Sequence, residues 1–435
     1  MSGICLDKTS LKACVIFPLV SGKDISLAPE ARLEEAVRLA QAIDLEVVHS
    51  EIVKLREIKP SIFFGNGFLE NLQNQLSASD IELVIVDTSL TPIQQRNLEK
   101  KLKVKVIDRT ALILEIFGER ANTKEGNLQV ELAHLTYQRS RLVRSWTHLE
   151  RQRGGAGFLG GPGETQIELD RRIIDDKIVR IKKDLEKVKK TRELQRGARK
   201  RVPYPVVALV GYTNAGKSSL FNRLANSQVF AEDLLFATLD PTMRKLRLPS
   251  GRDIILSDTV GFISDLPHEL VMSFRATLEE VLAADIVVHV RDLSNPNHPQ
   301  QKQDVLNVLK NLGLENAETQ NNYLEVWNKV DILSETERRF VDENAKRCDY
   351  IIPASAVSGE GCDAFLKAID EKLSADHKII EIKIPSSDGK MIAWLYKNGE
   401  VLSAQNRDEN QILKVKIDNL CLAKLSDKAE VKLLS

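Results

Sequence analysis

The chain has 435 residues, of which 43% are hydrophobic and 29% are charged, and its formal net charge is zero. A chain of this length normally divides into two to four domains, and a neutral chain can bind a polyanion only through a local patch. The five cysteines show no CxxC or metal-ligand spacing, which disfavours a zinc site or a disulfide framework. No signal peptide opens the chain, and no apolar run approaches the ~18 residues of a membrane-spanning helix. We therefore expect a cytoplasmic protein without a membrane span, and peripheral association with a membrane stays open. The sequence does not give the oligomeric state, but nothing in it demands a dimer, so we expect a monomer.

Residues 1–125 alternate short apolar runs with patterns of helical period. This alternation predicts a small α/β domain with a largely parallel sheet. Helices are expected at 29–44 and 91–102. The sequence GNGFLE at 65–70 is expected to form a turn, because it lacks the third glycine of a dinucleotide-binding fingerprint. The expected strands cover residues 13–20, 45–49, 61–65, 82–87 and 104–108.

Residues 126–200 change to a heptad pattern, in which apolar residues follow one another at coiled-coil spacing. Two such helices, joined by the run RGGAGFLGGPGE at 153–164, predict an antiparallel hairpin with the glycines at its tip. Glycine there would permit close backbone approach to RNA, while Phe158 and Leu159 could stack on bases or fold back on the arms. The seam residues are Leu128, Leu132, Leu135, Leu142, Trp146 and Leu149 in the first arm, and Ile174, Ile178, Ile181, Leu185 and Val188 in the second.

Both arms of this hairpin are basic. Residues 171–201 contain 14 Lys or Arg against 5 Asp or Glu, and residues 139–153 contain five Arg against one acid, Glu150. Such a charge run is either a solvated helix face or a surface that contacts phosphates.

Residues 201–375 again alternate strands and helices, and they begin with a phosphate-binding motif. The stretch VVALVGYTNAGKSSLFNRL reads as an apolar strand, a loop and an amphipathic helix, with G-x-x-x-x-G-K-S at 211–218. In such a loop, backbone N–H groups and the helix N-terminus cradle the phosphates. Lys217 is expected to reach the β- and γ-phosphates and Ser218 to bind Mg²⁺.

Two later motifs complete a site for Mg²⁺ and the γ-phosphate. FATLDPT at 236–242 offers Thr238 as a second hydroxyl ligand, and a strand ends in Asp258, which would hold the ion through water. The Gly261 N–H can meet the γ-phosphate, so this loop is expected to sense the nucleotide. The expected catalytic residues are Lys217, Thr238 and Gly261.

VWNKVD at 326–331 indicates that the base is guanine. A carboxylate at Asp331 can accept hydrogen bonds from N1–H and N2–H₂ of guanine, a donor pair that adenine lacks. Asn328 would brace the loop, and the Lys329 stem would cover the base. The residues expected to contact the nucleotide are Gly211, Tyr212, Thr213, Asn214, Ala215, Gly216, Lys217, Ser218, Ser219, Phe236, Ala237, Thr238, Leu239, Asp240, Asp258, Thr259, Val260, Gly261, Asn328, Lys329, Val330, Asp331, Ser355, Ala356 and Val357.

The last segment, 376–435, has strand-like runs at 379–385, 391–396 and 412–417, which predict a small α+β domain without recognisable chemistry. The expected fold class is therefore α/β. A P-loop GTPase domain with a mostly parallel sheet follows a small α/β domain and a long helical hairpin.

These motifs, together with WTHLERQ, GGPGETQIELDRRII and KVKKTRELQR, resemble the HflX family of the Obg–HflX group of GTPases over roughly residues 12 to 375. The resemblance implies binding of GTP and GDP, association with the large ribosomal subunit, and hydrolysis that the ribosome stimulates. It further implies splitting of stalled or stressed ribosomes, with the glycine-rich tip near the rRNA of the peptidyl-transferase centre. Arg291 departs from the family pattern, where a small or apolar residue is more usual.

Phe262 follows the DTVG motif, where Ras-like enzymes carry the glutamine that orients the attacking water. Phenylalanine cannot hydrogen-bond water, so slow intrinsic hydrolysis, completed by a partner, is expected. The sequence also permits Asn214 to bind K⁺, which would supply positive charge in the absence of an arginine finger.

Two rival functions remain open from sequence. One is a GTP-regulated protein that binds or remodels rRNA or mRNA, with ATP as an additional substrate. The other is a scaffold whose helical arms bind a protein partner. Binding to a polyanion weakens steeply with salt, whereas apolar helix contacts do not, so salt dependence separates them.

Overall fold

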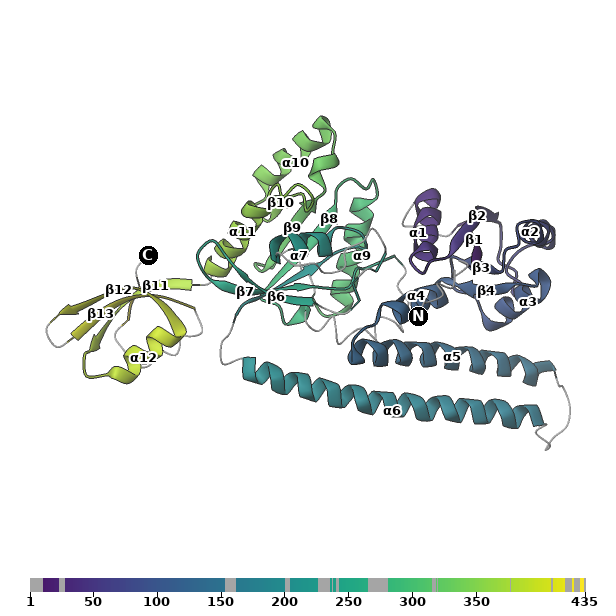
Figure 1. The fold of residues 1–435 in the computed structure, drawn as a ribbon, viewed down its shortest axis with the longest axis horizontal. Helices are drawn as coiled ribbons and strands as arrows, with labels where there is room; N and C mark the ends of the chain where they lie inside the picture. Colours follow the sequence, from purple (N-terminus) through teal and green to yellow (C-terminus); the bar gives the residue numbers. More distant parts are fainter. Residues whose placement is uncertain are drawn as a thin grey trace, which may run out of the picture. The chain divides into compact units, whose positions relative to one another are not determined.

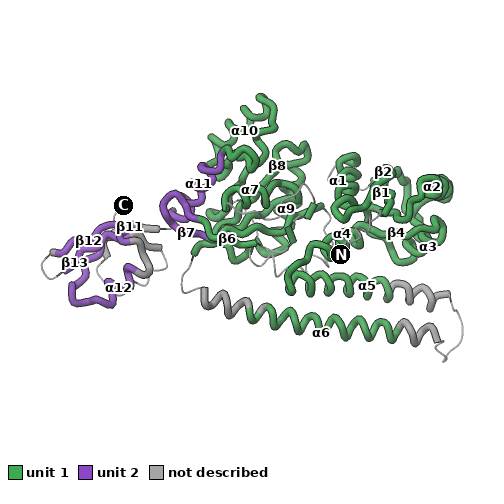
Figure 2. Tube along the Cα trace, in the orientation of Figure 1, with its two compact units in different colours: residues 1–246, 255–360 green, residues 247–254, 361–435 purple. Residues whose placement is uncertain are grey.

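The computed structural model describes most of the chain, in two compact units (Figure 2). The first unit comprises residues 1–246 and 255–360, and the second comprises residues 247–254 and 361–435. The described residues are 11–22, 28–152, 162–199, 204–225, 235–236, 238–239, 242–264, 281–314, 318, 320–375, 377–407, 410–418, 425 and 431–433.

The chain begins with a parallel four-stranded sheet in the order β2-β1-β3-β4. Alternate residues of its strands face opposite layers: Val15 packs with helices α1 and α4, whereas Ile16 packs with α2 and α3. The predicted parallel α/β domain is confirmed. Its strands are β1 (Lys12–Val20), β2 (Glu46–Leu55), β3 (Leu83–Val86) and β4 (Lys105–Asp108), and its helices are α1 (Pro29–Gln41), α2 (Asn66–Ala78), α3 (Pro92–Leu102) and α4 (Arg109–Arg120).

Two local predictions in this domain are wrong. Residues 61–65 form no strand, because Phe63 has a left-handed φ of +69° and pairs only through an isolated bridge to Lys59. The predicted turn at 65–70 is instead the start of α2, which buries Leu69, Leu72 and Leu76 at helical spacing.

The hairpin consists of α5 (Lys124–Gln152) and α6 (Pro162–Arg199), which lie side by side in Figure 1. Leu135, Ile178 and Ile181 are buried between them, and four other predicted seam residues pack around these three: Leu128, Leu132, Ile174 and Leu185. The predicted antiparallel hairpin is confirmed. The glycine-rich run at 153–161, with Phe158 and Leu159, lies outside the described residues.

A six-stranded sheet in the order β10-β9-β8-β5-β7-β6 follows, and its pairs from β10 to β7 are parallel. The carboxyl ends of parallel strands meet at one edge, so the loops after β5, β7 and β9 are brought together there. The strands are β5 (Val206–Val210), β6 (Thr242–Arg247), β7 (Asp253–Asp258), β8 (Ile286–Asp292), β9 (Tyr323–Asn328) and β10 (Ile351–Pro353); the helical elements are α7 (Lys217–Ala225), α9 (His298–Asn311), η2 (Val330–Ile332), α10 (Glu335–Arg347) and α11 (Cys362–Ala375).

The chain ends in an antiparallel sheet, β12-β13-β11-β14, packed against one helix, which confirms the predicted α+β segment. Residues 391–396 are helical, and their prediction as a strand is wrong. Asp388 accepts a hydrogen bond from the Met391 N–H at 3.1 Å, and Leu395 points into the core. The elements are β11 (His377–Pro385), α12 (Gly389–Asn398), β12 (Gly399–Arg407), β13 (Asn410–Asp418) and β14 (Val431–Leu433).

Across the described ranges, no helix has both the length and the apolar character needed to cross a membrane.

Candidate nucleotide-binding site

The loop 211–216 connects β5 to α7 and depends on its two glycines. Gly216 has a φ of +89°, and a Cβ atom there would lie 2.1 Å from Asn328 Nδ2. A Cβ atom on Gly211 would lie 2.2 Å from the carbonyl oxygen of Val290. Any side chain at either position would push the loop off its neighbours, so both glycines are required by close packing.

Lys217 is buried at the start of α7. Its Nζ donates to the carbonyl oxygens of Tyr212 at 2.8 Å and Gly211 at 3.1 Å. Burial lowers the pKa of Lys217 to about 8, although the nearby Asp258 carboxylate opposes this shift. The ammonium group is thus hydrogen-bonded to the loop that is predicted to bind phosphates.

Three oxygen-bearing side chains from distant parts of the sequence converge beside Lys217. Ser218 Oγ lies 2.6 Å from Asp258 Oδ2 and 2.8 Å from Thr238 Oγ1, and Thr238 Oγ1 lies 3.1 Å from the same carboxylate oxygen. The other oxygen, Asp258 Oδ1, is buried and makes no hydrogen bond within the described part of the chain. Burial raises the pKa of Asp258, against the opposing effects of Ser218 and Lys217.

This group of oxygen atoms fits Mg²⁺, which prefers hydroxyl, carboxylate and water oxygen ligands. A divalent cation would also provide charge for a buried carboxylate oxygen that otherwise stays without a partner. We therefore expect Ser218 and Thr238 to bind the ion directly and Asp258 to hold it through water, as the sequence predicts.

Asn328, at the end of β9, joins two loops of the predicted guanine site. Its Nδ2 donates to the Ala215 carbonyl oxygen at 2.8 Å, and its Oδ1 accepts from the Ala356 N–H at 3.0 Å. Asp331 follows in η2 with an exposed side chain. Asn328 thus links the loops of Ala215 and Ala356, and the exposed carboxylate of Asp331 is accessible to the edge of a guanine base.

The neighbouring residues hold this loop pair in place. Lys329 has a left-handed φ of +65°, and its Nζ lies 2.7 Å from Asp292 Oδ2. Ser355 is buried, and its hydroxyl accepts from the Ser358 N–H at 3.0 Å. Val357 is exposed, and its carbonyl oxygen accepts from Arg223 Nη1 at 3.3 Å, so its N–H is the group that would donate to guanine O6.

Arg291, the departure from the family pattern, belongs to a buried ion-pair cluster that sequence reasoning missed. It lies 2.8 Å from Glu325, and its guanidinium is 5.3 Å from the ring centre of Trp327. Glu325 also accepts from the Trp327 indole N–H at 2.9 Å and pairs with Lys302 at 2.7 Å. The cluster fixes the ends of β8 and β9, which carry Asp292 and Asn328. The sequence did contain a signal for this cluster: Arg291 and Glu325 are charged residues within two apolar strands.

Phe262 is buried, and its backbone joins the phosphate loop. Its N–H donates to the Gly211 carbonyl oxygen at 3.1 Å, and its own carbonyl oxygen accepts from the Thr213 N–H at 2.7 Å. Its ring therefore packs in the core and cannot orient water. Thr259 is equally fixed, since its hydroxyl donates to the Leu209 carbonyl oxygen at 2.6 Å.

The remaining predicted contacts differ in what they can offer a nucleotide. Phe236 and Leu239 have buried side chains, and the Tyr212 hydroxyl binds Glu35 and Ser264, so these three residues have only backbone atoms to offer a nucleotide. Thr213, Ala215, Val260 and Val330 are buried; Asn214 and Ser219 are half-buried, and Ala237 and Asp240 lie outside the described residues.

Four protein-family profiles together match most of the chain. Residues 30–118 match the profile described as GTP-binding GTPase N-terminal, and residues 120–199 match the GTP-binding GTPase Middle Region. Residues 206–329 match the profile described as 50S ribosome-binding GTPase, and residues 340–430 match the HflX C-terminal domain.

Individual relatives agree with these profiles. A GTPase HflX from Magnetococcus marinus is 48% identical over 398 residues, which cover 92% of this chain and 90% of the relative. The GTPase HflX of Escherichia coli is 41% identical over 365 residues, with 84% of each chain covered. A third, from Caldanaerobacter subterraneus, is 43% identical and spans 90% of this chain and 88% of the relative.

Proposed function

Because this chain belongs to the HflX family and is a GTPase, we propose that it hydrolyses GTP on the large ribosomal subunit and separates stalled or stressed ribosomes. The observation that carries this proposal is the long basic hairpin in the same compact unit as the nucleotide site. In the second arm, residues 171–201 have 14 basic against 5 acidic side chains. The family profile at 206–329, described as a 50S ribosome-binding GTPase, supports the same partner.

The hairpin suits rRNA because its apolar seam is internal and its charges are external. Ile178 and Ile181 are buried against α5, whereas Lys182, Lys183 and Lys187 are exposed. Exposed Lys and Arg neutralise phosphates without reading sequence. The arms would therefore bind an RNA surface, and the glycine-rich tip would reach toward the peptidyl-transferase region.

The buried ring of Phe262 supports slow hydrolysis by the protein alone. Mg²⁺, when bound at Ser218 and Thr238, supplies positive charge for the β- and γ-phosphate oxygens. Lys217 adds a second positive charge, and the Gly261 N–H meets the γ-phosphate. Since Phe262 stands where Ras-like enzymes carry the glutamine that orients the attacking water, the ribosome would complete this part of the site. We place the protein in the cytoplasm as a monomer.

Sedimentation with purified large subunits tests this proposal. The protein should pellet with the subunits in a non-hydrolysable GTP analogue and far less with GDP, because the γ-phosphate favours the bound form. No stabilisation by the analogue would contradict the proposal. Equal, salt-sensitive binding to free RNA in every nucleotide state would favour the rival RNA-remodelling function instead.

A further inference from the structure

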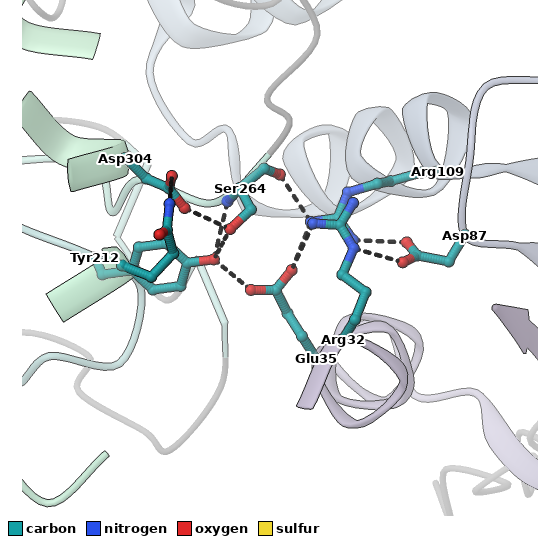
Figure 3. Close-up of polar contacts among 8 residues, drawn as sticks. Arg32, Glu35, Asp87, Arg109, Tyr212, Ser264 and Asp304 are labelled. Atoms are coloured by element: carbon teal, nitrogen blue, oxygen red, sulfur yellow. Dashed lines mark hydrogen bonds and ion pairs between the residues drawn. The ribbon is translucent and has the colours of Figure 1, made fainter. Parts of the chain in front are cut away.

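Four charged side chains of the first domain form a cluster in which Arg32, Asp87 and Arg109 are buried and Glu35 is 10% exposed (Figure 3). Arg109, the first residue of α4, lies 2.6 Å from Asp87 and 2.6 Å from Glu35. Arg32 lies 2.9 Å from the other oxygen of Asp87. Two cations thus face two carboxylates, and the cluster is electrically balanced.

Such a cluster has little freedom to rearrange. The side chains of Arg109 and Asp87 are 4% and 1% exposed. Burial by itself lowers the pKa of Arg109, but Asp87 and Glu35 outweigh it, so the net pKa is raised. Removing one partner of a buried ion pair leaves an uncompensated charge and is strongly destabilising. The guanidinium is therefore firmly fixed.

The cluster extends to the nucleotide-binding domain through Ser264 and Tyr212 (Figure 3). Arg109 Nη2 donates to the Ser264 carbonyl oxygen at 2.9 Å, and the Tyr212 hydroxyl donates to Glu35. The Ser264 N–H donates to the Tyr212 hydroxyl oxygen at 2.9 Å, and the Ser264 hydroxyl donates to Asp304 at 2.7 Å. Burial and the adjacent Glu35 raise the pKa of Tyr212, so it keeps its hydrogen.

We define the switch segment as residues 258–264; Ser264 is its last residue. Within this segment, Phe262 is bound through its backbone to the phosphate loop, and a Cβ atom on Gly261 would lie only 3.1 Å from Lys217 Nζ. Gly261 is the residue expected to meet the γ-phosphate. Its position is therefore set from one side by the phosphate loop and from the other by the anchor on Ser264.

Helix α4 contacts the other nucleotide-sensing loop as well. Phe117 packs edge-to-face on Phe236, with 4.7 Å between the ring centres. Phe236 lies two residues before Thr238, the expected Mg²⁺ ligand. Helix α4 thus contacts both loops that are expected to sense the γ-phosphate.

We propose that Glu35 and Arg109 are positioning residues for GTP hydrolysis: they fix Ser264 and Tyr212, and thereby set where Gly261 lies against the γ-phosphate. This role rests on the GTPase activity alone and is independent of ribosome binding. Because misplacement of a reacting group by about 1 Å can cost up to about 100-fold in rate, a loosened anchor should slow the chemical step. Nucleotide affinity, which depends on other residues, should change little.

Single-turnover hydrolysis by the full chain tests the proposal with two variants, Tyr212→Phe and Glu35→Gln. Each should lower the rate constant about tenfold, with the Kd for a fluorescent GDP analogue within about twofold of wild type. The double variant should also be about tenfold slower, because both changes break the same anchor. Glu34→Gln is the matched control on the same helix; Glu34 forms an exposed pair with Arg38, and the rate should not change.

Unchanged rates in both single variants would overturn the proposal. So would independent effects that multiply to about 100-fold in the double variant, or a loss of GDP affinity parallel to the loss of rate. If Glu35→Gln fails to fold, Tyr212→Phe remains decisive, because it removes one hydroxyl and leaves the ion pairs complete.

Discussion

Lys217 has a buried ammonium group that the protein alone does not fully stabilise. Its two loop carbonyl partners carry only partial charges, and burial lowers its pKa to about 8. The phosphates of GTP would bring full negative charge to the same atom, which favours the protonated form. Binding should therefore raise this pKa.

This linkage predicts that GTP affinity falls as the pH rises above about 8. Below that pH the free protein already holds the proton and affinity is flat. Above it, binding must take up a proton, so the Kd should rise by about tenfold per pH unit. Titration calorimetry between pH 7 and 9 in buffers of different ionisation heat measures both the affinity and the proton uptake. Lys217→Arg is the control, because arginine does not titrate there; an equal pH slope in both proteins would contradict the assignment.

At the scale of elements, the hairpin depends on a short buried seam. Ile178 lies in that seam and is 6% exposed, whereas Ile173, on the same helix, is 51% exposed. An unpaired carboxylate in the seam would be costly, but the same carboxylate on the outer face would remain in water.

Ile178→Asp should therefore open the hairpin, and Ile173→Asp should not. Limited trypsin digestion measures this opening, because residues 171–201 offer 14 Lys and Arg sites. Cleavage within α6 should be at least about tenfold faster in Ile178→Asp, while cleavage of Ile173→Asp should match wild type. Equal cleavage of the two variants would mean that the seam does not hold the arms together.

Most elements could be predicted from sequence because their apolar periodicity records which face is buried. The heptads predicted the seam around Ile178, and the alternation of strands and helices predicted both largely parallel sheets. The predictions for two short apolar runs, 61–65 and 391–396, were wrong. A run of five or six residues is too short for its periodicity to distinguish a strand from a helix.

Site residues could be named from the sequence where they belong to short motifs with a fixed spacing. Ser218, Thr238 and Asp258 come from separate motifs, and one oxygen atom of each lies within 3.1 Å of the other two; their role as ligands of Mg²⁺ stays a prediction. The pairs Arg291–Glu325 and Arg109–Glu35 could not be predicted, because each depends on tertiary packing between residues far apart in sequence.

At the scale of the first compact unit, one end of helix α4 joins the hairpin to the nucleotide site. Asp108 caps α4 and accepts from the Tyr137 hydroxyl of α5 at 2.8 Å, and it also pairs with Arg141 of α5. The next residue, Arg109, donates to the Ser264 carbonyl oxygen of the switch segment. The first arm of the hairpin and the switch segment are therefore attached to adjacent residues.

If the GTP-bound form is the one that holds the large subunit, as proposed above, binding of GTP, and not its hydrolysis, should separate the ribosomal subunits. Light scattering of purified ribosomes measures splitting directly. The wild-type protein with a non-hydrolysable GTP analogue should split ribosomes as completely as with GTP, and Lys217→Ala, which removes the phosphate-binding ammonium, should not split them. Full splitting by Lys217→Ala, or none by the wild type with the analogue, would contradict the claim.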